Sequence, residues 1–179
     1  MKKISIILIL VFTLFSQSNA QSESLNTGFG FGFHLSQVQR DFGLGLNLTS
    51  PYMIYDRLAI RLKGNFVWHE HINANLESTW TAYNNLSIGL LSVAGEIGGF
   101  MRLYGEGGLL MLFPSSDFSS EDTELGGYGL FGFEFYFQPN MNYYLEVGGA
   151  GTGAKANKVI GKPIYSNGLL INVGFRYVL

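Results

Sequence analysis

The sequence predicts an all-β protein, an eight-stranded antiparallel up-and-down transmembrane β-barrel. The first observation is that apolar residues alternate with polar or small ones in eight successive segments, as in strands that have two different faces. The second is composition: charged residues make up 13% of the chain, and 24 of its 179 residues are glycine, whereas ordinary domains have ~25% charged residues and ~7% glycine. So few charges cannot cover a water-facing surface, yet no apolar run is long enough for a membrane helix.

Residues 1–20 are expected to be an export signal, separate from the folded domain. Two lysines provide a basic start, residues 4–15 are an apolar run, and Ser18 to Ala20 form a small-residue cleavage site. The run is too short for a membrane-spanning helix, which takes about 20 residues. Residues 21–179 are expected to form one transmembrane β-barrel domain. Because the chain has no cysteine, neither a lipid-bearing cysteine nor a disulfide framework is expected.

The first three strands alternate most clearly. In residues 27–35, Phe29, Phe31 and Phe33 share one face, and glycines occupy the other. Each predicted strand has about the length that a tilted strand needs to cross a hydrocarbon core, roughly ten residues. The eight predicted strands are residues 27–35, 42–50, 58–68, 84–91, 100–112, 127–137, 142–151 and 168–179.

The fourth strand is the least regular. Leu86, Ile88 and Leu90 share a face, but Asn84 falls on that face as well, so we expect the strand to begin near Asn84 or to contain a bulge there. The connections alternate between short turns and polar stretches, as expected when an antiparallel barrel has turns at one rim and loops at the other. Turns are predicted at residues 50–56, 92–99 and 138–142, and polar connections at 36–41, 69–83, 114–124 and 152–167.

Two barrel architectures fit this alternation, and they place the apolar face in opposite positions. A soluble barrel of the lipocalin kind buries its apolar side chains, whereas a membrane barrel turns them toward lipid. The polar face carries mainly glycines and a few charges, too sparse for a water-facing exterior. The inside of an eight-stranded barrel is only wide enough to be filled by side chains. We therefore expect glycines inside and Phe29, Phe31 and Phe33 in contact with lipid.

Charged residues that are far apart in the sequence are predicted to meet inside the barrel. They share the inward face of their strands, and a rise of roughly 3.3 Å per residue puts most of them at similar heights. An unpaired buried charge is costly, so nearly equal numbers of positive and negative residues indicate an interlocked plug. An ion-selective pore would instead show an excess of one sign. The predicted interior network consists of Arg61, Lys63, Arg102, Glu106, Glu134, Glu146 and Arg176, with His34 nearby.

In these features the chain resembles the small eight-stranded outer-membrane β-barrel proteins of Gram-negative bacteria, the group that includes OmpX and the barrel of OmpA. The resemblance rests on the export signal, the eight alternating segments and the closing "GLLINVGFRYVL"; the Gly-rich, Tyr-rich style is also similar to outer-membrane barrel domains of Bacteroidetes. It implies the outer membrane of a Gram-negative bacterium, with membrane lipids and lipopolysaccharide as surroundings. The closing strand looks like the signal read by the barrel-assembly machinery, carried by Phe175, Tyr177 and Leu179, where leucine replaces the usual final aromatic.

Histidines are the sharpest local candidates for chemistry. His69 and His71 share the inward face at the outer mouth, and they would bind a metal if a third ligand such as Glu77 or Asp122 completed the site. The same histidines, with Glu77 and Ser78, are the group from which an enzyme at the outer rim would be built. Their spacing matches no recognised catalytic motif, and no cofactor is expected.

Surface interaction is the predicted function. Lys155, Lys158 and Lys162 have no acidic residue between them, so the loop is either a site for lipopolysaccharide phosphates or an ordinary solvated loop. No basic stripe indicates nucleic acid. We predict a non-enzymatic outer-membrane barrel with a filled interior that serves envelope integrity or surface interaction, with binding of an unspecified ligand through its outer loops as its activity. The alternatives are an enzyme that modifies lipid A or peptides at the outer rim, a narrow pore, and a soluble periplasmic lipocalin-like binder.

Overall fold

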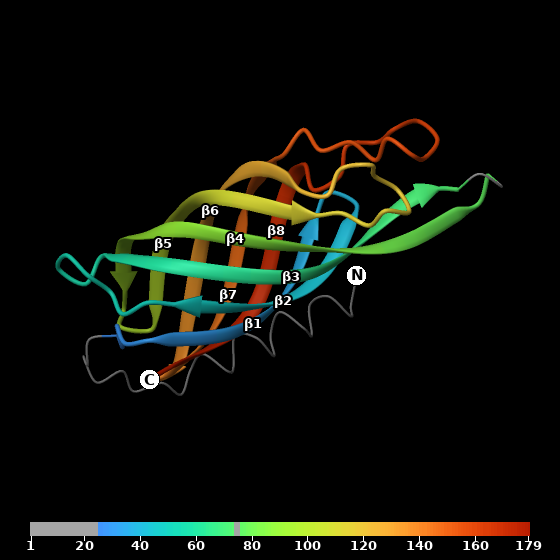
Figure 1. The fold of residues 1–179 in the computed structure, drawn as a ribbon. Coiled ribbons are helices and arrows are strands. Elements are labelled where there is room, and N and C mark those ends of the chain that lie inside the picture. The colour runs from blue at the N-terminus through green and yellow to red at the C-terminus, as the bar shows by residue number, and fades with distance from the viewer. Residues whose placement is uncertain (1–24, 74–75) are drawn as a thin grey trace, which may run out of the picture.

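The computed structural model describes residues 25–73 and 76–179. Within them, eight antiparallel strands form a closed barrel in which each strand pairs with its sequence neighbours and the last pairs with the first (Figure 1). The predicted fold class is confirmed, whereas the predicted export signal, residues 1–20, lies outside the described residues. The strands are β1 (Gly30–Val38), β2 (Asp41–Thr49), β3 (Leu58–Ile72), β4 (Ser78–Ile97), β5 (Met101–Phe113), β6 (Glu124–Gln138), β7 (Met141–Gly151) and β8 (Gly168–Val178).

Period-two alternation gives the barrel wall its two faces. In β1, Phe31 is 49% exposed, while His34 is 1% exposed. Cross-strand pairs keep the same order, since Phe31 lies opposite Leu48 on the outer face and Gly32 lies opposite Asn47 on the inner face. A wall that is apolar outside and polar inside is the arrangement that suits lipid.

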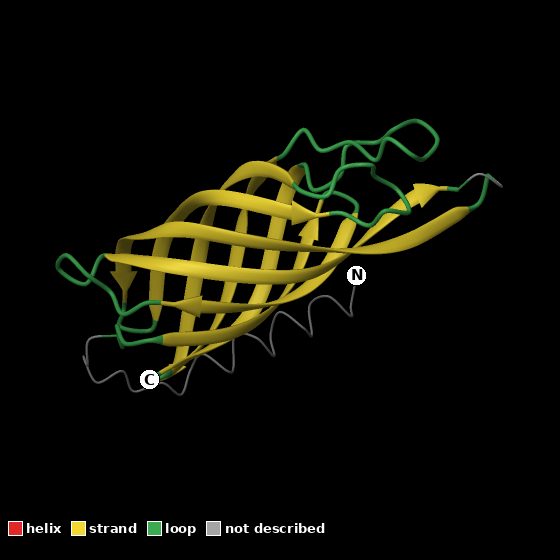
Figure 2. Ribbon diagram, viewed as in Figure 1, coloured by secondary structure: helices red, strands yellow, loops and turns green. Residues whose placement is uncertain are grey.

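The barrel has two different ends. At the turn end, short connections join β2 to β3, β4 to β5 and β6 to β7. At the loop end, β1 and β2 are joined by a two-residue turn, while the β5–β6 loop (residues 114–123) and the β7–β8 loop (residues 152–167) are the longest connections and lie together (Figure 2). No helix among the described residues is long and apolar enough to cross a membrane.

Strand β4 differs most from its prediction. Residues 92–99 are predicted as a turn, but β4 continues to Ile97. The turn that follows uses Gly98 and Gly99, whose φ angles of 61° and 68° lie in the left-handed region that glycine adopts without steric cost. The prediction of a turn is therefore right for Gly98 and Gly99, but it is wrong for residues 92–97, which belong to β4.

A bulge explains why the end of β4 escapes the period-two pattern. The β4–β5 ladder shifts register between Val93 and Gly95, not near Asn84 as predicted. The extra residue changes which residues point inward, so Glu96 comes to lie opposite the inward-facing Arg102. A carboxylate that sequence reasoning placed in a turn thus contacts Arg102 from the rim of the barrel, where its side chain is 39% exposed.

Residues 69–83 are predicted as an outer loop, but most of them are strand. Because β3 continues to Ile72 and β4 begins at Ser78, the two strands project as a hairpin beyond the other strands at the loop end (Figures 1 and 2). We call residues 69–73 and 76–82 the β3–β4 extension.

Glycines occupy different faces in different parts of the wall. In β1 and β2 they point inward as predicted, and a Cβ on Gly45 would lie 2.0 Å from Oδ1 of Asn65. In β5, β6 and β7, however, six glycines point outward, where an added Cβ would meet no atom closer than 3.5 Å. They form a bare patch, since Gly107, Gly129 and Gly149 lie side by side. This outward glycine band consists of Gly105, Gly107, Gly127, Gly129, Gly149 and Gly151.

Candidate functional site

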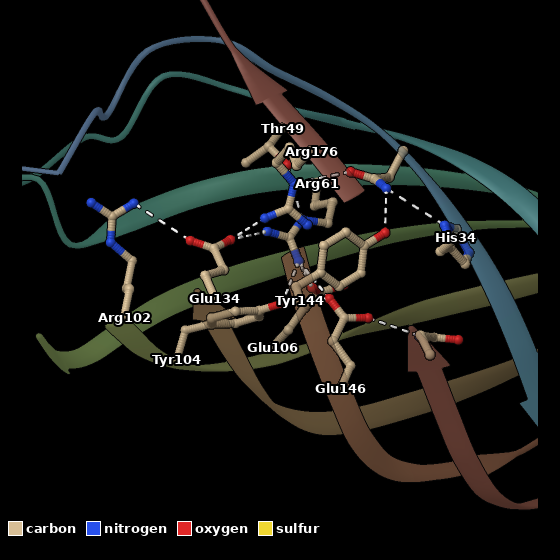
Figure 3. Close-up of polar contacts among 12 residues, drawn as sticks. His34, Thr49, Arg61, Arg102, Tyr104, Glu106, Glu134, Tyr144, Glu146 and Arg176 are labelled. Carbon is tan, nitrogen blue, oxygen red and sulfur yellow. Dashed lines mark hydrogen bonds and ion pairs between the residues drawn. The ribbon is translucent and has the colours of Figure 1, made fainter. Parts of the chain in front are cut away.

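The centre of the barrel interior holds a four-membered ionic cluster. Arg61 of β3 lies close to Glu106 of β5 and Glu146 of β7 (Figure 3), and Lys63 of β3 contacts the same two carboxylates. Arg61 lies 2.7 Å from Glu106 and 2.8 Å from Glu146, and Lys63 lies 3.0 Å and 2.8 Å from the same carboxylates. All four side chains are at most 4% exposed, so each charge depends on the others rather than on water.

A third carboxylate, Glu134 of β6, connects this cluster to the turn end. It contacts Arg176, and it lies 3.5 Å from Arg61 and 3.7 Å from Arg102. Arg102 in turn lies 2.9 Å from Glu96. The structure thus brings together all seven charged residues predicted from the sequence and adds Glu96, which gives four cations and four carboxylates in one connected network.

Tyrosines complete the network, and sequence reasoning missed them. Tyr104 donates a 2.6 Å hydrogen bond to Glu146, Tyr128 a 2.7 Å bond to Glu106, and Tyr136 a 2.9 Å bond to Glu134. A signal was available, because these tyrosines occupy the same alternate positions of β5 and β6 as the charged residues. Each hydroxyl donates a hydrogen bond to a buried carboxylate, whose oxygens can accept several such bonds.

The turn end is closed by the chain segment that precedes β1. The backbone carbonyls of Leu25 and Asn26 accept hydrogen bonds of 3.2 Å and 3.4 Å from Arg102. The ring of Tyr52 lies 4.8 Å from the Arg102 guanidinium, an attractive cation–π distance. Arg102 therefore ties the entering chain to the interior network.

The loop end is closed by apolar side chains from the two longest loops. Phe118 of the β5–β6 loop and Ala154, Ala156 and Tyr165 of the β7–β8 loop are each at most 1% exposed. We call these four residues the loop-end cap. The rings of Phe118 and Tyr165 lie 5.0 Å apart in an edge-to-face arrangement, which is a favourable aromatic geometry.

His69 and His71 lie directly beneath this cap. Phe118 lies 5.4 Å from the ring of His69 and 6.1 Å from that of His71. Asp41 of β2 accepts hydrogen bonds from Tyr83 and from the backbone N–H of Ser166, both at 2.9 Å. Its other oxygen lies 2.7 Å from Nδ1 of His69, so Asp41 links β2, β3, β4 and the β7–β8 loop.

Between the network and the cap there is a small polar cavity. It measures about 30 Å³ and is lined by residues that include His34, Asn65 and Asn172. His34 Nε2 lies 2.6 Å from Oδ1 of Asn65. A cavity of this size holds roughly two water molecules, which suits a closed interior better than a channel.

The predicted metal and enzyme groups do not assemble. Glu77 and Asp122 are exposed, and the described residues contain no group of three or more His, Cys, Asp or Glu side chains that could hold a metal ion. Ser78 is exposed and donates a 2.7 Å hydrogen bond to Glu70, while His69 bonds to Asp41 on the inner side.

The other predicted site residues lie on the surface. Lys155, Lys158 and Lys162 are exposed on the β7–β8 loop, and Nζ of Lys158 donates a 2.8 Å hydrogen bond to the carbonyl of Ser116 in the β5–β6 loop. In the closing strand, Tyr177 is 37% and Leu179 is 73% exposed. Phe175 packs edge-on against Tyr143, with ring centroids 5.6 Å apart.

Comparison with known proteins relates this chain to solved structures only. A scan against protein-family models and a search of curated proteins both gave no match. The N-terminal β-barrel domain of Pseudomonas aeruginosa OprF aligns with 86% of this chain and 98% of its own length, at 13% identity and a TM-score of 0.57. The outer membrane protein OprG from Pseudomonas aeruginosa aligns with 87% of this chain and 98% of its own, at 15% identity and a TM-score of 0.53.

This chain shares its architecture with both structures over nearly its full described length. The apolar outer face and the charged interior of the barrel suit a membrane environment. The chain has the fold of the eight-stranded outer-membrane β-barrels of Gram-negative bacteria.

Proposed function

We propose that this protein is a non-enzymatic surface protein of the outer membrane that binds a partner through its loop end, while its filled interior serves stability. In this proposal, residues 1–20 direct export and are cleaved, and Phe175, Tyr177 and Leu179 present the closing strand to the barrel-assembly machinery. The turn end then faces the periplasm and the loop end faces the cell exterior.

The observation that carries the proposal is the unpaired edge of the β3–β4 extension. Asn84 is the first residue of β4 that pairs with β5, whereas pairing with β3 already begins at Ser78. Within the described residues, no backbone hydrogen bond joins residues 78–82 to a segment other than β3. This stretch, the free edge, reads "STWTA" and has neither a charged residue nor a proline, two of the devices that normally protect an edge strand.

The hydrogen-bond pattern shows which groups of the free edge are available. The N–H of Asn73 bonds to the carbonyl of Glu77 at 3.0 Å, which fixes the alternation along the antiparallel ladder. Thr79 and Thr81 therefore direct their backbone groups toward β3. Trp80 and Ala82 direct theirs away from it, to the side where β5 would lie if it continued.

An extended peptide segment of another protein is the partner that this edge fits. Such a segment adds as a further strand through main-chain hydrogen bonds, and neighbouring side chains give specificity. Trp80 is 51% exposed on this stretch and offers a large apolar contact of the kind that anchors interfaces.

The test is a selection of random peptides on the protein in lipid nanodiscs. We expect enriched peptides to bind wild type and to lose about tenfold in affinity with Ala82→Pro, because one N–H is removed and the ring obstructs the incoming strand. Ala82→Thr keeps the N–H and should bind like wild type. Failure to enrich any peptide over a variant that lacks residues 73–77 and the free edge would contradict the proposal.

The three lysines of the β7–β8 loop support a contact with lipopolysaccharide. They project from one loop, and each cation near an anionic membrane surface contributes about 1 kcal/mol. Replacing Lys155, Lys158 and Lys162 by glutamine should weaken binding to lipopolysaccharide vesicles relative to phosphate-free lipid vesicles. Equal binding of the triple variant and wild type would leave the loop without this role.

A further inference from the structure

The free edge of the β3–β4 extension lies in an acidic part of the loop end. Residues 69–82, which include the extension, and residues 114–124, which include the β5–β6 loop, contain no lysine or arginine. Within the described residues, none of their carboxylates takes part in a salt bridge. We call these carboxylates the acidic border: Glu70, Glu77, Asp117, Glu121, Asp122 and Glu124.

The β5–β6 loop stands on the side of the free edge that an added strand would occupy. Pairing between β4 and β5 ends with Asn84 opposite Phe113, and the chain then leaves the sheet to form this loop. Phe118 of the loop packs against the ring of His71 in the extension, with ring centroids 6.1 Å apart, and the neighbouring Asp117 is exposed. A strand that extends the sheet beyond Phe113 therefore runs beside carboxylates of both segments.

The outer face of the extension provides a place for a cationic side chain. Trp80 lies opposite Glu70 in the β3–β4 ladder, so their side chains share one face. The hydroxyl of Ser78 donates to Oε1 of Glu70, and Oε2 accepts no hydrogen bond from the described residues. The residue of an added strand opposite Trp80 points to the same face. A lysine or arginine at that position can lie against the indole ring and direct its charge toward Glu70.

The charge of this region disfavours two other partners for the free edge. A second copy of the chain would bring two acidic borders together, and like charges across an interface repel. Lipopolysaccharide phosphates carry the same sign as the acidic border and fit the lysines of the β7–β8 loop instead. Lys158 reaches the β5–β6 loop, but it donates to the backbone carbonyl of Ser116 and not to a carboxylate, so the acidic border keeps its charge.

We propose that the partner of the free edge is an extended segment with basic residues at alternate positions. Its backbone pairs with residues 78–82, and its basic side chains meet the acidic border. The inference rests on the proposed peptide binding at the free edge and adds the chemistry of the partner. The alternation follows from strand geometry, because every second side chain of the added strand lies on the face of Trp80 and Glu70. Complementary charge of this kind gives specificity and faster association.

Peptide selection on the protein in lipid nanodiscs tests the chemistry of the partner. We expect the enriched sequences to carry lysine or arginine at alternate positions. A synthetic copy of such a peptide with every lysine and arginine replaced by glutamine should bind at least about tenfold more weakly. Added salt should weaken the basic peptide and have little effect on the glutamine peptide, because salt screens exposed charges.

Variants of the protein identify the carboxylates responsible. Glu70→Gln keeps an acceptor for Ser78 and should weaken the basic peptide by about two- to fivefold, the range of an exposed ion pair. Asp56→Asn removes an exposed carboxylate at the turn end and should leave binding unchanged. A larger loss, at least about tenfold, is expected for a combined variant with Glu70→Gln, Glu77→Gln, Asp117→Asn and Asp122→Asn. The glutamine peptide should bind the combined variant and wild type alike.

The outcomes separate the basic partner from the proposed function. Enrichment of neutral or acidic peptides that lose binding with Ala82→Pro would refute the basic partner and keep the free edge as a binding site. Equal affinity of the basic peptide for wild type and the combined variant would refute it in the same way. A dimer of the protein that Ala82→Pro abolishes would replace the basic segment by a second copy. If no peptide is enriched, peptide binding at the free edge fails, and the basic partner fails with it.

Discussion

The ionic network and the loop-end cap fill two parts of one barrel by different means. In the network, all eight charged side chains have an opposite charge within 3.7 Å. Beneath the cap, the buried imidazole of His71 has an unpaired nitrogen and no carboxylate partner among the described residues. The difference shows that the fold concentrates its electrostatic stabilisation within the strands and leaves its loops on weaker aromatic packing.

Removing one carboxylate of the network should have the largest effect. Glu146 accepts from Arg61, Lys63, Tyr104 and Asn172 at 2.6–2.8 Å. Glu146→Ala leaves two buried cations with weaker compensation, so the free energy of unfolding should fall by about 3–5 kcal/mol, measured by urea unfolding in lipid vesicles.

An exposed carboxylate provides the control for that loss. Glu121→Ala should change the free energy of unfolding by less than about 0.5 kcal/mol, because Glu121 lies on the surface. Similar losses in the two variants would show that the network does not stabilise the barrel as described.

Packing around the network should show an intermediate effect. A Cβ on Gly132 would lie 2.1 Å from Cζ of Tyr104, whereas on Gly129 of the same strand it would meet no atom closer than 4.0 Å. Gly132→Ala should therefore lower the free energy of unfolding by about 1–3 kcal/mol, and Gly129→Ala should be nearly neutral. Equal effects in urea unfolding would contradict the inward and outward assignment of β6.

Disrupting the cap should have the smallest effect on global stability. Phe118→Ala removes the ring that contacts His69, Tyr83 and Tyr165, but Phe118 itself lies in a loop, and loops open locally without unfolding the strands. We expect a change below about 1 kcal/mol in unfolding and faster hydrogen exchange at the Tyr165 amide. Ile160→Ala, at an exposed site of the same loop, should change neither, and a large global loss with Phe118→Ala would place the cap within the cooperative fold.

The sequence predicted the barrel and its ionic interior because both follow from period two. Arg61 and Glu146 both occupy inward-facing alternate positions, on β3 and β7, so closure of the barrel brings their side chains together. Glu96 could not be predicted, since the bulge at Val93 and Gly95 reverses the parity of the residues that follow.

The loop end was less predictable for a different reason. The β3–β4 extension stands beyond the other strands, so it no longer separates an apolar from a polar surface, and its sequence resembles a polar loop. The contact between Asp41 and Ser166 joins positions 125 residues apart. Ser166 lies in a loop, and a loop has no periodic sequence pattern that predicts where its residues lie.

The outward glycine band gives the barrel a flank unlike the rest of its circumference. Phe131, 73% exposed, and Leu109, 69% exposed, stand beside bare backbone there. An acyl chain can lie against the peptide groups of β5, β6 and β7 instead of against side-chain tips. Lipid on this flank therefore approaches the barrel axis more closely than it does elsewhere. The outer surface of the barrel is thus not the same on all sides.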